Sequence, residues 1–156
     1  MTAEKILVQK RNSREKEPLN IEKIHQMVEF ACEDISGVSA SQVEMKSGLQ
    51  FFDGISTDQI QQILIKSASD LISLETPNYQ YVAARLLLFS LRKSIFRKLW
   101  DHPHLYEHTK KGVEIKVYDA DILKLYDKSE FDRMNMWIDH TRDYNFTYAG
   151  LRQVID

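Results

Sequence analysis

Apolar residues recur at helical spacing in four successive segments between residues 20 and 100, and this repetition constrains the fold more than any other feature. The first segment places six apolar residues on one face: Ile21, Ile24, Met27, Val28, Ala31 and Ile35. Each segment carries such a stripe, and helices bury their apolar stripes against one another. The sequence therefore predicts a mainly α fold built around a four-helix bundle.

Residues with strong capping preferences mark where these helices begin. The second helix has two overlapping capping boxes, Ser39–Gln42 and Ser41–Glu44, and should run to about residue 51. The third carries apolar residues as far as Ile72, and the fourth extends toward Trp100. The predicted starting residues are Asn20, Ser39 or Ser41, Ser56 with Thr57, and Thr76 with Pro77.

Two short β-type runs, Ile6 to Arg11 and Glu17 to Leu19, precede the helices and are joined by a polar turn. They predict a hairpin that covers one end of the bundle, with a loop of several residues because no glycine serves the turn. The first run ends in Lys10 and Arg11, with nothing local to neutralise their charges. Such a pair can grip a phosphate, although on spacing alone a solvated strand end is the simpler interpretation.

Two further residues could contribute to an anion site. Thr57 lies at a predicted helix N-terminus, where unpaired N–H groups favour an anion, but from sequence alone a plain N-cap is the favoured interpretation. Lys93 lies late in the fourth helix, where a basic residue usually complements the helix dipole. The sequence contains neither common glycine-rich phosphate loop. Periodicity alone does not bring Lys10, Thr57 and Lys93 together.

Residues 99–156 form a second predicted region with shorter helical segments. These lie around Tyr106 to Lys111, Ala120 to Tyr126 and Glu130 to His140, and a further helix starts after Phe146. The region has no periodic core of its own, so we expect it to lead into a larger structure. The predicted organisation is a domain over residues 1–98 followed by this helical region.

Composition excludes several classes of function. The formal net charge of −2 gives no global field that attracts nucleic acid, and no apolar run approaches the ~20 residues that span a bilayer. The single cysteine, Cys32, excludes an internal disulfide framework and is expected to be a small core residue. His104 and His108 have metal-ligand spacing but no third ligand is indicated. Without a signal-peptide segment, the expected compartment is cytoplasmic.

The order of these features resembles the ATP-cone, the nucleotide-sensing module at the start of class I ribonucleotide reductase large subunits. The resemblance rests on Lys10-Arg11, on the Asp53-Gly54-Ile55-Ser56-Thr57 segment and on the run from Tyr79 to Lys93. It continues through Ile138-Asp139-His140 and Phe146-Thr147-Tyr148, in a tail that resembles the helical region leading into the catalytic barrel. The implied fold is a β-hairpin capping a four-helix bundle, followed by further short helices.

The resemblance implies an allosteric site for ATP or dATP, with Mg²⁺ accompanying the triphosphate. The residues implied for this site are Lys10, Arg11, Glu17, Asn20, Lys23, Ile24, Thr57 and Lys93. The basic end of the first strand, the threonine and the fourth-helix lysine meet the triphosphate. Glu17 and Asn20 hydrogen-bond the adenine edge, and Ile24 packs on its face. Gln61 stands where many relatives carry a histidine, and its amide supplies no positive charge.

The implied function is regulatory: ATP activates and dATP inhibits deoxyribonucleotide synthesis. Reductase chemistry in this family needs a radical-bearing cysteine and a redox cysteine pair, so this chain alone should be inactive and needs no redox cofactor. The implied partners are the remainder of the large subunit, the radical-generating small subunit and a second cone, but neither nucleic acid nor a membrane. The alternatives are a helical protein-interaction module and a stand-alone ATP-cone protein. A cone-bearing repressor is disfavoured, because it would need the paired cysteines of a zinc ribbon.

Overall fold

The computed structural model describes residues 6–10, 15–97 and 102–155, which fall into two compact units. One unit combines Met1–Leu91 with Asp143–Asp156, and the other is Arg92–Arg142. The end of the chain thus packs with its beginning. The predicted domain boundary, between residues 98 and 99, falls outside the described ranges. Among the helices described, none combines the length and apolar character that a bilayer crossing requires.

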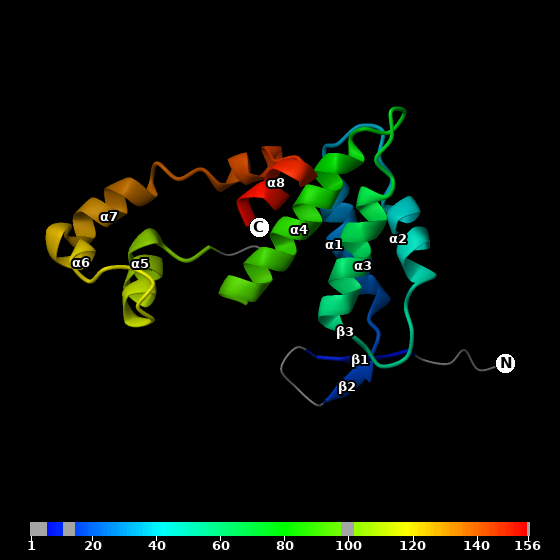
Figure 1. Cartoon of the computed structure of the whole chain (residues 1–156), viewed down its shortest axis with the longest axis horizontal. Coiled ribbons are helices and arrows are strands. Elements are labelled where there is room, and N and C mark those ends of the chain that lie inside the picture. The colour runs from blue at the N-terminus through cyan, green and yellow to red at the C-terminus, as the bar shows by residue number, and fades with distance from the viewer. Residues whose placement is uncertain (1–5, 11–14, 98–101, 156) are drawn as a thin grey trace. The chain divides into compact units, whose positions relative to one another are not determined.

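A three-stranded sheet lies at the start of the first unit (Figure 1). β1 (Leu7–Gln9) pairs antiparallel with β2 (Lys16–Pro18), which confirms the predicted hairpin. β3 (Ile55–Ser56) pairs parallel with β1 and gives the order β2-β1-β3. The sequence did not predict β3, because two residues are too few to show an alternating pattern.

Four helices follow the hairpin, and they confirm the predicted mainly α fold (Figure 1). They are α1 (Ile21–Cys32), α2 (Ala40–Gly48), α3 (Thr57–Ser69) and α4 (Tyr79–Phe96). The apolar stripes of these helices form the core together with the inner face of the sheet. Fully buried members of this core include Val28, Ala31, Val43, Ile55, Leu64, Ala68, Val82 and Phe89.

The helices start close to the predicted positions, but the side-chain caps predicted at Ser39 and Thr76 do not form. Asn20 caps α1 as expected, with its Oδ1 accepting from the Lys23 N–H at 3.0 Å. No capping box forms at Ser39; its N–H donates instead to the Tyr79 hydroxyl at 2.9 Å, and that hydroxyl donates to Gln42 Oε1 at 2.7 Å. A tertiary contact replaces the local cap because the hydroxyl of a buried tyrosine needs hydrogen-bond partners.

Three helices end earlier than their periodicity predicts. α1 stops at Cys32, and Asp34 has a φ of 58°, which an α-helix cannot include, so Ile35 lies outside it. α2 and α3 end at Gly48 and Ser69, each about one turn before its predicted limit. Thr76 does not cap α4, because its hydroxyl donates to a backbone carbonyl of the preceding loop at 2.7 Å.

The later helices confirm the predicted segments with shifted limits. α5 (Leu105–Glu114), α6 (Ile122–Leu125) and α7 (Lys128–Asn135) belong to the second unit. Phe131 of α7 is 2% exposed and contacts the rings of Tyr106 and Tyr126, so this unit has a small core that the sequence did not predict. The 3-10 helix η1 (His140–Asn145) leads to α8 (Tyr148–Ile155), which returns to the first unit and buries Leu151.

Candidate functional site

The register of the sheet brings Lys10 and Thr57 to the same end of neighbouring strands. The last pair of the parallel ladder joins Gln9 and Ser56, and Lys10 and Thr57 each follow directly after that pair. Side-chain alternation along β1 puts Lys10 on the face that buries Val8, whereas Thr57 is already the first residue of α3. β3 is therefore the element that places the start of α3 beside the end of β1.

The turn before β3 is fixed by two hydrogen bonds to β1. The Gly54 N–H donates to the Leu7 carbonyl at 2.8 Å, and the Leu7 N–H donates to Asp53 Oδ1 at 2.9 Å. Gly54 has a φ of 81°, a left-handed conformation that glycine adopts without strain. The Asp53-Gly54 break that is visible in the sequence thus sets the position of β3, and with it the position of Thr57.

Lys10 does not stand alone at the hairpin end. Its Nζ lies 2.9 Å from Glu17 Oε2 on β2, and both side chains are about half exposed. The hydrogen bond to Glu17 raises the pKa of Lys10, and the same hydrogen bond holds the pKa of Glu17 below its ordinary value. The expectation that nothing local neutralises Lys10 is therefore wrong. The partner sits across the hairpin, where linear spacing does not show it.

The start of α1 adds three more of the predicted residues next to this pair. The positive charge of Lys23 contributes to the lowered pKa of Glu17, so Lys23 and Lys10 both act on the same carboxylate. Asn20 uses its Oδ1 to cap α1, which leaves its amide N–H₂ as the group that can donate to a ligand. Ile24 is half-buried and supplies an apolar surface one turn into the helix. The segment thus combines a carboxylate, an amide and an apolar face.

α3 presents its N-terminus at this same end of the sheet. Ser56 Oγ accepts from the Gln59 N–H at 3.1 Å, and Gln59 Oε1 accepts from the Ser56 N–H at 2.9 Å. The Ser-x-x-Gln spacing of this capping box is visible in the sequence, although only Ser56 and Thr57 were predicted to start the helix. Thr57 is the first helical residue, and helix geometry gives its N–H no intrahelical acceptor. The helix dipole favours an anion here, although Asp58 in the first turn opposes it.

Gln61 lies one turn beyond Thr57 on α3. Its side chain is only 5% exposed, and its Oε1 has no hydrogen-bond partner among the described residues. Helical side chains tilt toward the N-terminus, so Gln61 leans toward the turn that holds Thr57. This position therefore supplies a neutral amide beneath the helix end.

The remaining predicted residues can be described only in part. Lys93 lies in the last turn of α4, is half-buried, and belongs to the second unit. Arg11 lies outside the described residues. The structure therefore pairs Lys10 with Glu17, lets the charge of Lys23 act on Glu17, and sets Thr57 at the same end of the sheet as Lys10. Asn20 and Ile24 lie in the segment that follows β2.

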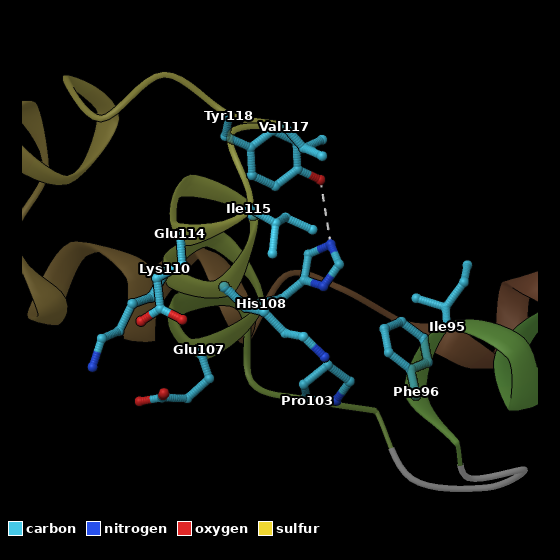
Figure 2. Close-up of a pocket in the computed structure, with 12 residues that line it drawn as sticks. Ile95, Phe96, Pro103, Glu107, His108, Lys110, Glu114, Ile115, Val117 and Tyr118 are labelled. Carbon is cyan, nitrogen blue, oxygen red and sulfur yellow. Dashed lines mark hydrogen bonds between the residues drawn. The ribbon is translucent and has the colours of Figure 1, made fainter.

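A separate groove of about 710 Å³ lies in the second unit (Figure 2). Phe96 and His108 contact each other edge to face, and His108 Nε2 lies 3.3 Å from the Tyr118 hydroxyl. The charged residues of the lining are mixed in sign: Glu107, Glu114, Lys110 and Lys111. Because these charges offset one another, the groove has no field that would select a triphosphate.

Other candidates from the sequence are occupied or inert. Cys32 is partly buried, and burial raises the pKa of its thiol to about 11, which disfavours a nucleophilic thiolate. His104 caps α5 by accepting from the Tyr106 N–H at 3.3 Å, and its Nε2 lies 3.4 Å from Asp132. With His108 directed at Tyr118, these two histidines have separate partners, which does not support a shared metal.

A three-stranded sheet that closes one end of four helices, with Lys10 and the start of α3 at the same sheet end, defines a small, mainly α-helical module. The chain belongs to the ATP-cone family, whose ATP cone domain model matches residues 6–94. The matched range contains every residue of the candidate site. It also ends close to the last turn of α4, which fits the boundary between the two compact units.

The chain is also similar to the N-terminal part of ribonucleotide reductase large subunits. It is 47% identical over 149 residues to the ribonucleoside-diphosphate reductase subunit alpha of Buchnera aphidicola subsp. Acyrthosiphon pisum. Over the same number of residues it is 45% identical to the ribonucleoside-diphosphate reductase 1 subunit alpha of Escherichia coli K12. The Helicobacter pylori 26695 subunit alpha is 39% identical over 152 residues. Each match covers at least 96% of this chain, which spans only about a fifth of these relatives' length. The resemblance seen in the sequence is confirmed.

Proposed function

We propose that this chain is the activity-regulating module of a ribonucleoside-diphosphate reductase, in which ATP favours and dATP disfavours deoxyribonucleotide synthesis. The observation that carries the proposal is the β1–β3 register, which aligns Lys10 with the N-terminus of α3 inside the family-matched residues. A lysine next to unpaired helix N–H groups suits a polyphosphate. The sensing domain covers residues 1–98, and the helical region 99–156 connects it to the remainder of the large subunit.

Most residues of the proposed site can be given a specific role. Lys10, Thr57 and Lys93 bind the triphosphate together with Arg11, and Mg²⁺ accompanies the bound nucleotide to offset its charge. Glu17 accepts from the adenine amino group, and the free amide of Asn20 donates to a ring nitrogen. The list of proposed nucleotide-binding residues is Lys10, Arg11, Glu17, Asn20, Lys23, Ile24, Thr57 and Lys93.

Regulation requires that the ligands stabilise different states of the protein. A ligand that binds two states with equal affinity does not shift the equilibrium between them. ATP and dATP differ by one 2′-hydroxyl, and an apolar wall at that position separates them by ~100-fold at most. We propose that dATP, more than ATP, promotes association of the module with a second cone or with the radical-generating small subunit. The output is therefore assembly, while the chemistry belongs to the rest of the enzyme.

Isothermal calorimetry of the chain with ATP, dATP and GTP tests this function. We expect saturable binding of both adenine nucleotides and weaker binding of GTP, whose base presents an acceptor where adenine presents an amino group. Absence of heat and of a thermal shift at millimolar dATP would favour the helical protein-interaction module instead. Sedimentation with each nucleotide, with and without the small subunit, tests the assembly output.

A further inference from the structure

We propose that the Lys10–Glu17 ion pair competes with the ligand. Only a nucleotide that provides a new partner for Lys10 and a new partner for Glu17 then binds with full affinity. The inference rests on the proposed function, because it takes Lys10 as a phosphate contact and Glu17 as a base contact. The observation behind it is the ion pair itself: Lys10 Nζ lies 2.9 Å from Glu17 Oε2, so each of the two proposed ligand contacts already has a partner within the chain.

The geometry permits an exchange of partners. Both side chains are about half exposed, so each can turn away from the other without opening the core. The Lys10 ammonium has three N–H donors, but a phosphate oxygen that binds it must share its single positive charge with Glu17, so repulsion between the two anions favours displacement of the carboxylate. The displaced carboxylate stays between β2 and α1, where the charge of Lys23 still acts on it. Removing Lys10 from the pair therefore leaves Glu17 only partly compensated.

The exchange selects for a particular ligand chemistry. Inorganic triphosphate can bind the Lys10 ammonium, but it has no hydrogen-bond donor for the Glu17 carboxylate. The negative charge of the triphosphate also repels the released carboxylate. An adenine nucleotide supplies its 6-amino group as a new donor to Glu17 while its phosphates take Lys10. The pair therefore penalises bare polyphosphates and favours adenine nucleotides. This differs from simple recognition of the base, because Glu17 weakens one class of ligand as well as strengthening another.

The test compares the wild-type chain with Glu17→Gln, using sodium triphosphate and ATP as separate probes in Mg²⁺-free buffer. An exposed ion pair is worth at most ~1 kcal/mol, which corresponds to roughly fivefold in affinity. We expect Glu17→Gln to bind inorganic triphosphate about two- to fivefold more tightly than the wild type. ATP affinity should not rise in parallel, because a neutral amide accepts a weaker hydrogen bond than a carboxylate.

Glu75→Gln is the matched control, since it makes the same change in net charge. Glu75 follows α3, whose 13 residues span about 20 Å from the Thr57 end, so it lies remote from the sheet edge. Equal triphosphate affinity in the wild type, Glu17→Gln and Glu75→Gln would overturn the competitor role while leaving ATP sensing intact. A parallel gain for triphosphate and ATP would also overturn it. A wild-type chain that binds neither probe would instead remove the proposed function itself.

Discussion

The guanidinium of Arg85 lies over the ring of Tyr144, 5.3 Å from its centroid, and so joins α4 to the last segment of the chain. The same Arg85 donates from Nη1 to the Glu33 carbonyl at 2.6 Å, where α1 has just ended. Tyr144 also meets the ring of Phe89 edge to face, and Phe89 contacts Phe30 of α1. Residues 143–155 are therefore held onto α1 and α4 by a single connected cluster.

Replacing Tyr144 should loosen this last segment from the first unit. Tyr144→Leu removes both the cation–π contact and the edge-to-face ring contact, which together contribute about 1–2.5 kcal/mol. We expect faster amide hydrogen exchange in α8 with little change in β1. Tyr126→Leu, which removes a ring contact in the second unit, is the control. Unchanged exchange in α8 of the Tyr144 variant would show that Leu151 alone holds the segment.

The Tyr79 hydroxyl should contribute measurably to stability. Tyr79→Phe leaves the Ser39 N–H and Gln42 Oε1 without the partner they have in the wild type, at a site where the ring is 1% exposed. Loss of a buried hydrogen-bond partner costs about 1–3 kcal/mol. Urea unfolding should show a decrease of this size. Tyr81→Phe, on the same helix but half-buried, should change the free energy of unfolding by much less.

Stability should depend on pH through His25. Its Nδ1 lies 2.7 Å from Glu44 on α2 and its Nε2 lies 3.2 Å from Glu29 on α1. The hydrogen bond to Glu44 raises the pKa of His25 above its ordinary value of 6.5. A raised folded-state pKa stabilises the fold fully below the unfolded pKa, and this contribution is lost as the pH rises through the folded value.

We therefore expect the free energy of unfolding to fall as the pH increases from about 6 into the mildly alkaline range. Urea unfolding at several pH values measures the slope, and His25→Gln should flatten it by removing the titrating ring. If the wild type and His25→Gln show the same slope between pH 6 and 8.5, the pair does not link α1 and α2 in the folded chain.

The proposed triphosphate contacts should be separable from folding. Lys10→Ala and Lys93→Ala should each weaken ATP binding roughly 10- to 100-fold, since a hydrogen bond to a charged group contributes about 1.5–3 kcal/mol. Lys66→Ala removes an exposed lysine near the opposite end of α3, where it pairs with Asp70, and should leave ATP binding unchanged. Calorimetry on the three variants checks this. Wild-type affinity in all three would mean that the assigned site is wrong even though the fold is right.

Gly112 should be needed for the packing of the second unit. A Cβ at this position would clash with the ring of Tyr118. Gly112→Ala should therefore lower the stability of this unit by about 1–3 kcal/mol, and adding Tyr118→Ala should cancel the steric part of that loss. Gly48→Ala, where a Cβ meets nothing within 4 Å, is the control in thermal unfolding.

The sequence predicted most of the fold because its signals are local. Asn20 caps α1 as expected, and the four apolar stripes form the four helices. The errors arise where a distant residue intervenes. Tyr79 replaces the cap expected at Ser39, and no local pattern indicates a partner 40 residues away. Helix ends were overestimated, because apolar residues continue the period after the backbone has already turned.

In the candidate site, too, the individual residues were predicted from local signals but the contacts between distant residues were not. Lys10 and Thr57 were identified as separate residues, and only the family resemblance joined them. Their adjacency depends on β3, a strand too short to carry a sequence signal. The neutralisation of Lys10 by Glu17 was missed for a related reason, since it requires the hairpin register of β1 and β2.

The parallel pairing of β1 with β3 also bears on when this site can first exist during synthesis. A hairpin closes locally, but joining Gln9 to Ser56 requires the chain to close a loop that contains α1 and α2. Non-local contacts of this kind form late in folding, because the chain must lose the entropy of closing the loop before the contacts can stabilise it. A nascent chain that ends before α3 therefore carries Lys10 and Glu17 but no binding site. If the proposed site binds nucleotide, we expect nucleotide to stabilise the chain only once α3 has left the ribosome.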